Sequence, residues 1–260
     1  MGTALQARGL PRGAAPELWN LMHPEMVMAV HCTHVAAGAC WIQTNTFGAN
    51  RVRLAGSGME TEVDRINAAA VRCARSSAGA ATVLGCIGPA GGDPSGWSQA
   101  YAEQSNALVR QGVEGLVVET ILGLAEGTAA IGAAAATGVW VMASYTPGRD
   151  GNLLDGTSAE TAAEHFVRAG AAAIGVNCGF GPDTMLDPVR RLSAAGVAPV
   201  LARPNAGLPE WKDGLACYSL QPDVFAQAAI QFREAGASLI AGCCGTTDEH
   251  LHAASLLLNA

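Results

Sequence analysis

The sequence predicts an α/β protein built on a (β/α)8 (TIM) barrel that lacks its first β-strand. Short apolar runs alternate with longer amphipathic runs along all 260 residues, and this alternation is typical of parallel sheets with helical crossovers. The length is close to that of such barrels, about 250 residues. No domain linker interrupts the alternation, so residues 1–260 are expected to form a single barrel domain.

The predicted strands are nearly continuous in hydrophobicity, as expected for strands that are buried on both faces. They comprise residues 40–44, 81–87, 115–119, 139–145, 172–177, 198–202 and 238–242. A closed barrel needs eight strands. The missing strand would come first, before Met1.

Helix-like segments separate these strands and close the chain. They comprise residues 24–37, 60–77, 98–111, 122–136, 159–169, 182–194, 222–235 and 248–258. Ser158 and Asp248 are the expected N-caps of two of them, because short polar side chains accept hydrogen bonds from free N–H groups at helix starts. Residues 91–96 and 204–214 are predicted loops within the alternation.

Composition narrows the class of protein. Half of the residues are hydrophobic and 14% are charged, which supports a large core and argues against disorder. A net charge of −7 argues against a nucleic-acid-binding protein, which normally carries a basic face. No apolar run reaches the roughly 18 residues of a membrane span, and the N-terminus lacks a secretory signal. We therefore expect a cytoplasmic protein that binds neither nucleic acid nor membrane.

Polar and thiol side chains follow the predicted strands, at the edge where parallel barrels carry their functional sites. These strand-end residues are Asn45, Glu119, Asn177, Cys178, Arg203, Asn205, Cys243 and Cys244. Three cysteines, Cys178, Cys243 and Cys244, are thus expected to point into one mouth. Arg203 could pair with a carboxylate of the protein or of a substrate.

This trio of thiols suits a metal ion. Three thiolates fill three corners of tetrahedral Zn²⁺ and leave the fourth for a substrate. A second thiol is a natural occupant, because zinc converts a group with a pKa near 8.5 into a thiolate. From the spacing alone, a redox or purely packing role of the thiols stays open beside zinc binding. Hydrolysis would prefer histidine ligands and a water, so a zinc site with three thiolates favours alkyl transfer to sulfur. The remaining thiols are expected to be small buried hydrophobes: Cys32, Cys40, Cys73, Cys86 and Cys217.

Eight segments match, in order, the motifs of one known family. They are Pro16-Glu17-Leu18-Trp19-Asn20, Thr44-Asn45-Thr46-Phe47-Gly48-Ala49-Asn50-Arg51, Gly85-x-Ile87-Gly88-Pro89, Glu119-Thr120, Asp155-Gly156-Thr157, Val176-Asn177-Cys178, Pro204-Asn205-Ala206-Gly207 and Gly242-Cys243-Cys244-Gly245-Thr246-Thr247. The chain resembles the homocysteine S-methyltransferases, which include betaine–homocysteine methyltransferase and the homocysteine-binding module of cobalamin-dependent methionine synthase.

The resemblance implies one zinc ion per chain, held by Cys178, Cys243 and Cys244. It also implies that this zinc activates the thiol of L-homocysteine for methyl transfer, which gives methionine. No catalytic side chain is expected beyond the zinc-activated substrate thiolate.

By the same resemblance, Glu119 is expected to hold the ammonium group of the substrate. A cationic amine deep in a barrel mouth needs such an anionic partner. Asn45, Asn177 and Asn205 are the other candidates for substrate contact. For Asn45 and Asn205 the alternative is a loop-shaping role through bonds to the backbone.

One departure from the family concerns the N-terminus. Family members usually open with an apolar strand followed by Asp-Gly-Ala-x-Gly-Thr, and this chain begins with Met1-Gly2-Thr3, which looks like the tail of that motif. A late start codon and a natural shortening are the two explanations. We expect the 260-residue chain to be less stable and less active than one extended upstream, because a barrel lacking a strand has two unpaired edges.

The methyl donor must come from outside the chain, which has no room for a folate or corrinoid domain. We expect either a small onium compound, such as betaine or S-methylmethionine, or methylcobalamin carried by a separate corrinoid protein. A homo-oligomer is left open. The alternative function is a non-catalytic zinc-binding barrel that acts as a partner subunit or thiol sensor, and a redox enzyme using Cys243 and Cys244 ranks third.

Overall fold

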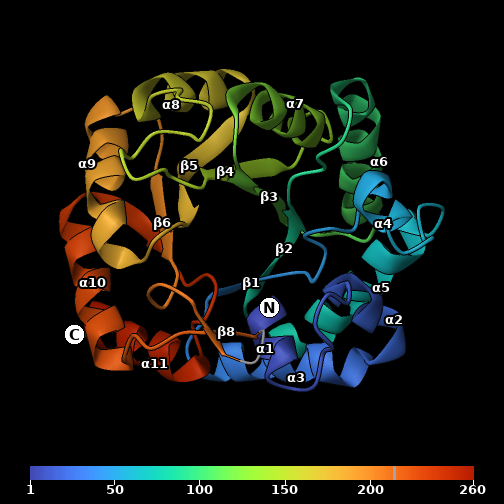
Figure 1. The fold of residues 1–260 in the computed structure, drawn as a ribbon, viewed down its shortest axis with the longest axis horizontal. Coiled ribbons are helices and arrows are strands. Elements are labelled where there is room, and N and C mark those ends of the chain that lie inside the picture. Colours follow the sequence, from blue (N-terminus) through green and yellow to red (C-terminus); the bar gives the residue numbers. More distant parts are fainter. Residues whose placement is uncertain (213–214) are drawn as a thin grey trace.

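Seven parallel strands form one curled sheet in the computed structural model, which describes residues 1–212 and 215–260 (Figure 1). The strand order is β1-β2-β3-β4-β5-β6-β9, so each strand of this sheet lies beside its neighbour in sequence. The strands are β1 (Trp41–Gln43), β2 (Thr82–Ile87), β3 (Gly115–Ile121), β4 (Trp140–Tyr145), β5 (Ala171–Cys178), β6 (Val200–Pro204) and β9 (Ala237–Ile240). All seven predicted strands are confirmed, with small shifts at their ends.

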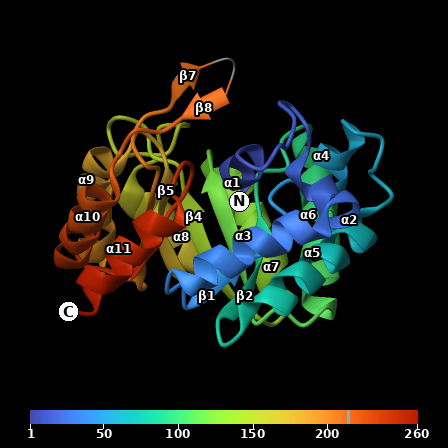
Figure 2. The same ribbon diagram turned by 90° about the horizontal axis from the view of Figure 1, so that it is seen from below.

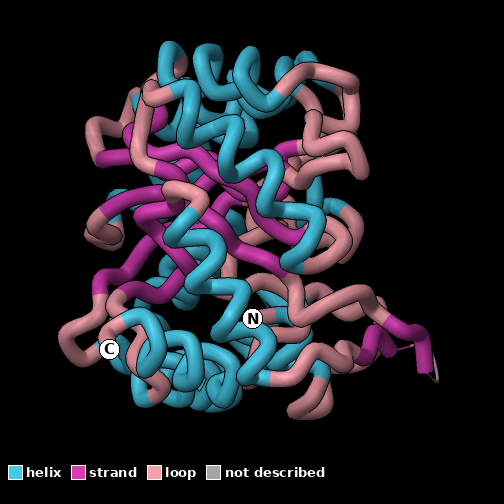
Figure 3. Tube along the Cα trace, turned by 90° about the vertical axis from the view of Figure 1, so that its left-hand side faces the viewer, coloured by secondary structure: helices cyan, strands magenta, loops and turns pink. Residues whose placement is uncertain are grey.

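Helices cover the outer face of the sheet, as Figures 1 and 3 show. The long ones are α3 (Pro24–Ala36), α5 (Val63–Ala78), α6 (Trp97–Arg110), α7 (Leu124–Ala135), α8 (Ala159–Arg168), α9 (Leu186–Ala195), α10 (Pro222–Glu234) and α11 (Asp248–Leu258). Each matches a predicted helix, although a separate 3-10 turn, η3 (Pro182–Met185), precedes α9. Shorter elements that the sequence did not predict are α1 (Gly2–Gln6), η1 (Pro16–Leu18), α2 (Trp19–Met22), α4 (Arg51–Ala55) and η2 (Pro94–Gly96).

A small hairpin corrects the predicted loop over residues 204–214. Strands β7 (Glu210–Lys212) and β8 (Leu215–Cys217) pair antiparallel, and Figure 2 shows them projecting beyond the mouth of the curled sheet. Residues 213 and 214, which end the predicted loop, lie outside the described residues. The exposed side chain of Trp211 explains why no apolar strand pattern appears here.

Two of the predicted helix caps have different outcomes. The Ser158 side chain accepts a hydrogen bond from the backbone of Thr161 and caps α8 as expected. At α11 the N-cap is Thr247 instead of Asp248, which is the first helical residue. Thr247 and His250 form a reciprocal capping box there, in which the side chain of each accepts a hydrogen bond from the backbone N–H of the other. An N-cap at Asp248 is therefore not needed.

The sheet buries side chains on both faces, which explains the continuous apolar runs. Its inner face contributes a small cluster inside the curl, formed by Leu84, Val117, Met142, Ala173 and Leu201. Its outer face packs against the helices in the largest apolar cluster of the described residues. Alternate residues of each strand thus fill the interior and the helix layer.

The sheet ends at β1 and β9, which face each other without pairing, and no strand of the described residues lies between them. Helices α3 and α11 close the outside of this seam and contact each other. The backbone N–H of Gly245, after β9, also donates to Thr3 of α1 (3.3 Å). The fold is therefore a curled, parallel seven-stranded half-barrel, consistent with a TIM-like barrel that lacks one strand. The structure describes no helix with both the length and the apolarity that crossing a bilayer demands.

Candidate metal centre

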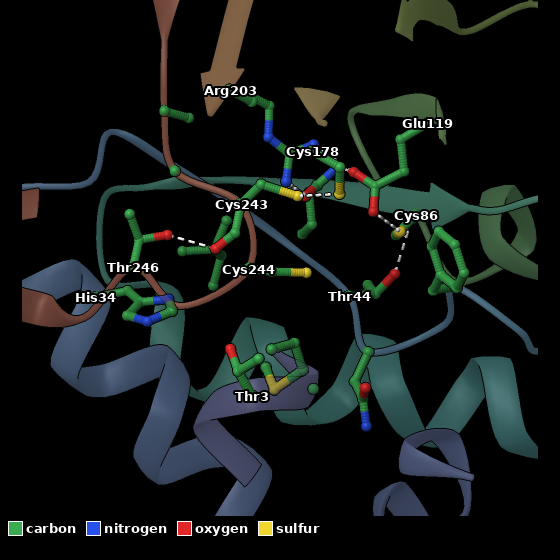
Figure 4. Close-up of a pocket in the computed structure, with 18 of the residues that line it drawn as sticks. Thr3, His34, Thr44, Cys86, Glu119, Cys178, Arg203, Cys243, Cys244 and Thr246 are labelled. Atoms are coloured by element: carbon green, nitrogen blue, oxygen red, sulfur yellow. Dashed lines mark hydrogen bonds and ion pairs between the residues drawn. The ribbon is translucent and has the colours of Figure 1, made fainter. Parts of the chain in front are cut away.

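Three cysteines meet at the mouth of the curled sheet, as the sequence predicts. Cys178 is the last residue of β5, and Cys243 and Cys244 follow β9. Their Sγ atoms all lie within 4.8 Å of one another, with Cys178 and Cys243 separated by 2.7 Å (Figure 4). Among the described residues, this is the one cluster of three Cys, His, Asp or Glu side chains placed to hold a metal ion.

The backbone at Cys178 adopts a conformation that is unusual for a side-chain-bearing residue. Its φ is +62°, and Thr120 at the end of β3 has a φ of +61°. Both values lie in the left-handed region that non-glycine residues seldom enter. Such strained residues persist only where the surrounding structure holds them, and they are concentrated at functional sites.

Asn177 holds both strained segments from a fully buried position. Its Oδ1 accepts hydrogen bonds from the Thr120 N–H (2.9 Å) and the Ser144 hydroxyl (2.7 Å), and its Nδ2 donates to Thr120 Oγ1 (2.8 Å). The same Nδ2 lies 3.9 Å from Cys243 Sγ. The Asn177 side chain thus connects β3, β4 and the Cys243 thiol.

The cysteine pair after β9 is fixed by its neighbours on β6. The Cys243 N–H donates to the carbonyl of Pro204 (2.9 Å). Asn205 Oδ1 accepts from the Cys244 N–H (3.1 Å), while its Nδ2 donates to the carbonyl of Gly179 (3.0 Å). Asn205 therefore joins the two segments that carry the thiols.

The electrostatics of the three thiols indicate a cation site. Hydrogen bonding to Cys243 and Cys244, together with burial, raises the pKa of Cys178, whereas hydrogen bonds from Cys178 and Cys243 lower the pKa of Cys244. One sulfur can thus ionise, but three thiolates so close together repel one another unless a positive ion lies between them. Tetrahedral zinc with bonds of about 2.3 Å would space its sulfurs about 3.8 Å apart. The three thiols are close enough together to be drawn onto one such ion, but the Sγ atoms of Cys178 and Cys243, which are 2.7 Å apart, would have to separate by about 1 Å to bind it.

A cavity of about 1250 Å³ adjoins the thiols. Figure 4 shows Glu119, Arg203 and Cys86 on one side of it and Thr3 and His34 on the other. The cavity continues into the seam between β1 and β9, where side chains of both strands line it. Its size would hold a small substrate and a second small molecule.

Glu119 is central to a polar network in this cavity. Its Oε2 pairs with Nη1 of Arg203 and accepts from Nε2 of Gln43 (3.1 Å). Arg203 Nη2 in turn donates to Gln43 Oε1 (2.7 Å). Among the residues that the structure describes, Glu119 Oε1 accepts from the weak Sγ–H donor of Cys86 alone (3.4 Å). The sequence singled out Glu119 but left the partner of Arg203 open. In the structure this partner is Glu119, because the sheet that pairs β3, β4, β5 and β6 curls and brings the two side chains together.

The three asparagines differ in their access to this cavity. Asn45 lines it, while its Nδ2 donates to the carbonyl of Pro16 (2.7 Å) and to Asn20 Oδ1 (3.1 Å). Asn177 and Asn205 are not among the described residues that line the cavity, and their amide groups are bonded to protein atoms. The loop-shaping role considered for Asn45 and Asn205 thus has observed partners. Direct contact of the three with substrate stays a prediction.

The other cysteines follow the prediction only in part. Cys73 and Cys86 are buried as expected, and Cys217 is partly buried. Cys32 and Cys40 are exposed, so the expectation of buried core cysteines is wrong for them. Cys32 lies within α3, and Cys40 lies just before β1.

The curled parallel sheet, with a thiol cluster at the C-terminal ends of its strands, defines a barrel-type protein with a candidate metal centre at its mouth. Residues 1–257 match the family model described as homocysteine S-methyltransferase. The chain belongs to the homocysteine S-methyltransferase family, and the family prediction is confirmed.

Relatives agree with this assignment. The methionine synthases of Mycobacterium leprae and Mycobacterium tuberculosis are each 32% identical to the chain over 96% of its length. The chain spans only 23% of either protein. The homocysteine methyltransferase MmuM from Escherichia coli, in its metallated form, is 24% identical and superposes with a TM-score of 0.83, covering 98% of this chain and 93% of that one. At this identity the likeness shows a shared fold.

Proposed function

We propose that the protein is a zinc-dependent homocysteine S-methyltransferase that forms methionine. The observation that carries the proposal is the cluster of Cys178, Cys243 and Cys244 at the cavity. These three thiols would hold one zinc ion and leave its fourth position open toward the cavity. Zinc bound there would supply a substrate thiol held as a reactive thiolate at neutral pH.

The residues around the cluster would keep it rigid. Asn177 fixes Cys243 and the strained end of β5, and Asn205 fixes the backbone of Cys244. Such outer contacts orient metal ligands and tune the affinity for the ion. A thiol bound at the open position would therefore meet its methyl donor in a fixed geometry, and positioning of this kind supplies a large part of the rate in group transfer.

Glu119 would receive the ammonium group of homocysteine. Its carboxylate lines the same cavity as the thiols, and in the described part of the chain its Oε1 has the Cys86 thiol as its one partner. An ammonium group carries three strong donors, so it would satisfy this oxygen far better than a thiol does.

The donor would be a small onium compound, such as betaine or S-methylmethionine, or a methyl-corrinoid on a separate protein. The cavity volume of about 1250 Å³ supports room for a small donor beside homocysteine, and Trp41 and Phe47 line it with aromatic surface suited to an onium ion. A corrinoid donor would instead require a docking protein over the mouth.

We also propose that the half-barrel is a (β/α)8 barrel with one vacant strand position. The parallel order, the two unpaired edges and the cavity that enters the seam between β1 and β9 support this interpretation. A closed ring would place β1 and β9 on either side of the vacant position.

The test begins with zinc per chain in the purified protein, beside Cys178→Ala and Cys243→Ala. We expect about one zinc in the parent and none in either variant, whereas Cys73→Ala, which removes a buried thiol remote from the cluster, should retain it. Methionine formation from homocysteine is then followed by mass spectrometry with each donor. Zinc and thiol binding without turnover for any donor would identify the thiol sensor instead, and activity that survives chelation would identify a redox enzyme.

A further inference from the structure

A buried ion pair lies beside the cysteine cluster. Arg203 projects from β6 and Glu119 from β3, and their residues are 6% and 8% exposed. Both side chains line the cavity that Cys178 and Cys243 also line, and Figure 4 shows the guanidinium group directed toward these sulfurs. The pair is therefore part of the cavity wall next to the open side of the candidate metal centre.

The hydrogen bonds of Arg203 leave capacity for a ligand. A guanidinium group has five N–H donors. Nη1 bonds Glu119 and Nη2 bonds Gln43, but Nε is buried and has no partner among the described residues. Buried donors nearly always have an acceptor in native proteins, so this edge of the guanidinium group is a place where a ligand oxygen would bind.

The two members of the ion pair can each bind one more group, and these two groups must carry opposite charges. Arg203 offers the unpaired Nε–H donor, while among the described residues Oε1 of Glu119 accepts from the Cys86 thiol alone. Arg53 and Arg233 also line the cavity, but they are exposed at its rim. The ligand chemistry that matches a buried cation and a buried anion in contact is a zwitterion, and an α-amino acid presents its two charges on one carbon atom.

We propose that Arg203 is the residue that selects an amino-acid thiol, by binding its α-carboxylate while Glu119 receives its ammonium group. This inference rests on the proposed function and deepens it, since it names the part of the substrate that a side chain of β6 recognises. The zwitterion replaces one buried ion pair by two, so no unpaired charge is left in the cavity. The planar guanidinium group also suits a carboxylate better than an ammonium group would.

The experiment compares three thiols that differ only in their charged groups, binding to the zinc-loaded protein and measured by titration calorimetry. L-Homocysteine carries both groups, 3-aminopropane-1-thiol lacks the carboxylate, and 4-sulfanylbutanoate lacks the ammonium group. In the parent we expect each loss to weaken binding about 10- to 100-fold, the range of a hydrogen-bonded charged group. Arg203→Met should bind 3-aminopropane-1-thiol, which lacks the carboxylate, less than about threefold more weakly than L-homocysteine. It should still bind 4-sulfanylbutanoate, which lacks the ammonium group, much more weakly than L-homocysteine.

Companion variants separate recognition from folding. Arg203→Met leaves Glu119 buried without its cation, so the double variant Arg203→Met/Glu119→Gln is made to remove both charges. This double variant should no longer prefer L-homocysteine to either of the other two thiols. Arg203→Lys should recover part of the preference for the carboxylate. Arg191→Met is the matched control, since it breaks an equivalent Arg–Glu pair with Glu160 on the outer helices, and its discrimination should equal that of the parent. Zinc content and melting temperature are measured for each.

The outcomes are distinct. If Arg203→Met and the double variant bind zinc and still reject 3-aminopropane-1-thiol as the parent does, then Arg203 does not bind the carboxylate and the inference fails, although the proposed function stands. If the zinc-loaded parent binds none of the three thiols, both fail. If the parent binds all three thiols equally, the cavity takes thiols in general and the inference is again overturned.

Discussion

Replacing Asn177 by alanine should destabilise the fold and weaken metal binding together. The Asn177 side chain is fully buried, and its Oδ1 is the acceptor for the Thr120 N–H and for the hydroxyl of buried Ser144. The substitution leaves these two donors without an acceptor, at about 1–3 kcal/mol each. We expect a loss of about 2–5 kcal/mol in the free energy of unfolding, which lowers the melting temperature by roughly 5–15 °C for a chain of this size.

Metal affinity should fall by about 10- to 100-fold in the same variant, the usual effect of losing an outer contact to a ligand. The reason is that Asn177 also reaches the Cys243 thiol and steadies the left-handed backbone at Cys178. Urea unfolding of the metal-free protein, followed by circular dichroism, gives the stability. Competition with a chromophoric chelator gives the zinc affinity.

Asn106→Ala is the control, because Asn106 is exposed on α6 and, among the described residues, its amide bonds Ala102 of its own helix alone. Its stability should stay within about 0.5 kcal/mol of the parent. If Asn177→Ala matches Asn106→Ala in both stability and zinc affinity, then the hydrogen bonds of Asn177 do not support the cluster and the reasoning from its contacts is refuted.

Three further outcomes are expected from stability measurements. Burial lowers the pKa of His31 to about 3, so below pH 6.5 the unfolded chain binds a proton that the folded chain does not. The free energy of unfolding therefore falls toward pH 3, by at most about 1.4 kcal/mol per pH unit from this residue. His31→Leu should flatten this slope, and an unchanged slope would contradict the burial argument. Arg191 lowers the pKa of Glu160 to about 2, so the advantage of the parent over Glu160→Gln should be present above pH 4.5 and vanish as the pH falls toward 2, and a difference independent of pH would rule out the ion pair as its source. The Tyr101 hydroxyl donates to Glu126 (2.7 Å) and accepts from a backbone N–H; Tyr101→Phe should lose about 1–3 kcal/mol in urea unfolding, and an equal midpoint would show that water replaces these bonds.

The order of strands and the meeting of the three thiols could be predicted because both follow from local patterns. Each strand is buried on two faces, so it appears in the sequence as an apolar run, and Cys178, Cys243 and Cys244 stand directly at the ends of such runs. Once the runs are taken as parallel neighbours, their ends must share one edge. The hairpin of β7 and β8 has three-residue strands and an exposed Trp211, and it carries no such pattern.

Contacts between distant residues could not be predicted in the same way. Arg203 and Glu119 are 84 positions apart, and their pairing depends on the curl of the sheet bringing β6 opposite β3. The exposure of Cys32 and Cys40 depends on how α3 is rotated and where it ends, which composition does not reveal. The choice of Thr247 over Asp248 as a cap turns on the position of the His250 ring, a side-chain detail that either residue type would permit.

The seam between β1 and β9 borders the cavity but does not run between the three thiols of the candidate metal centre. All three thiols belong to β5 and to the turn after β9, which are joined through β6 without crossing the seam. Among the described residues, helix packing, the Thr3–Gly245 bond and the hydrogen bond from Arg203 of β6 to Gln43 of β1 tie the two sides of the seam together. A local opening along this line would therefore spare the thiol cluster while exposing the cavity to water. Amide hydrogens of β1 should then exchange at a lower opening free energy than those of β5, so the three thiols would stay together while the cavity opens and closes.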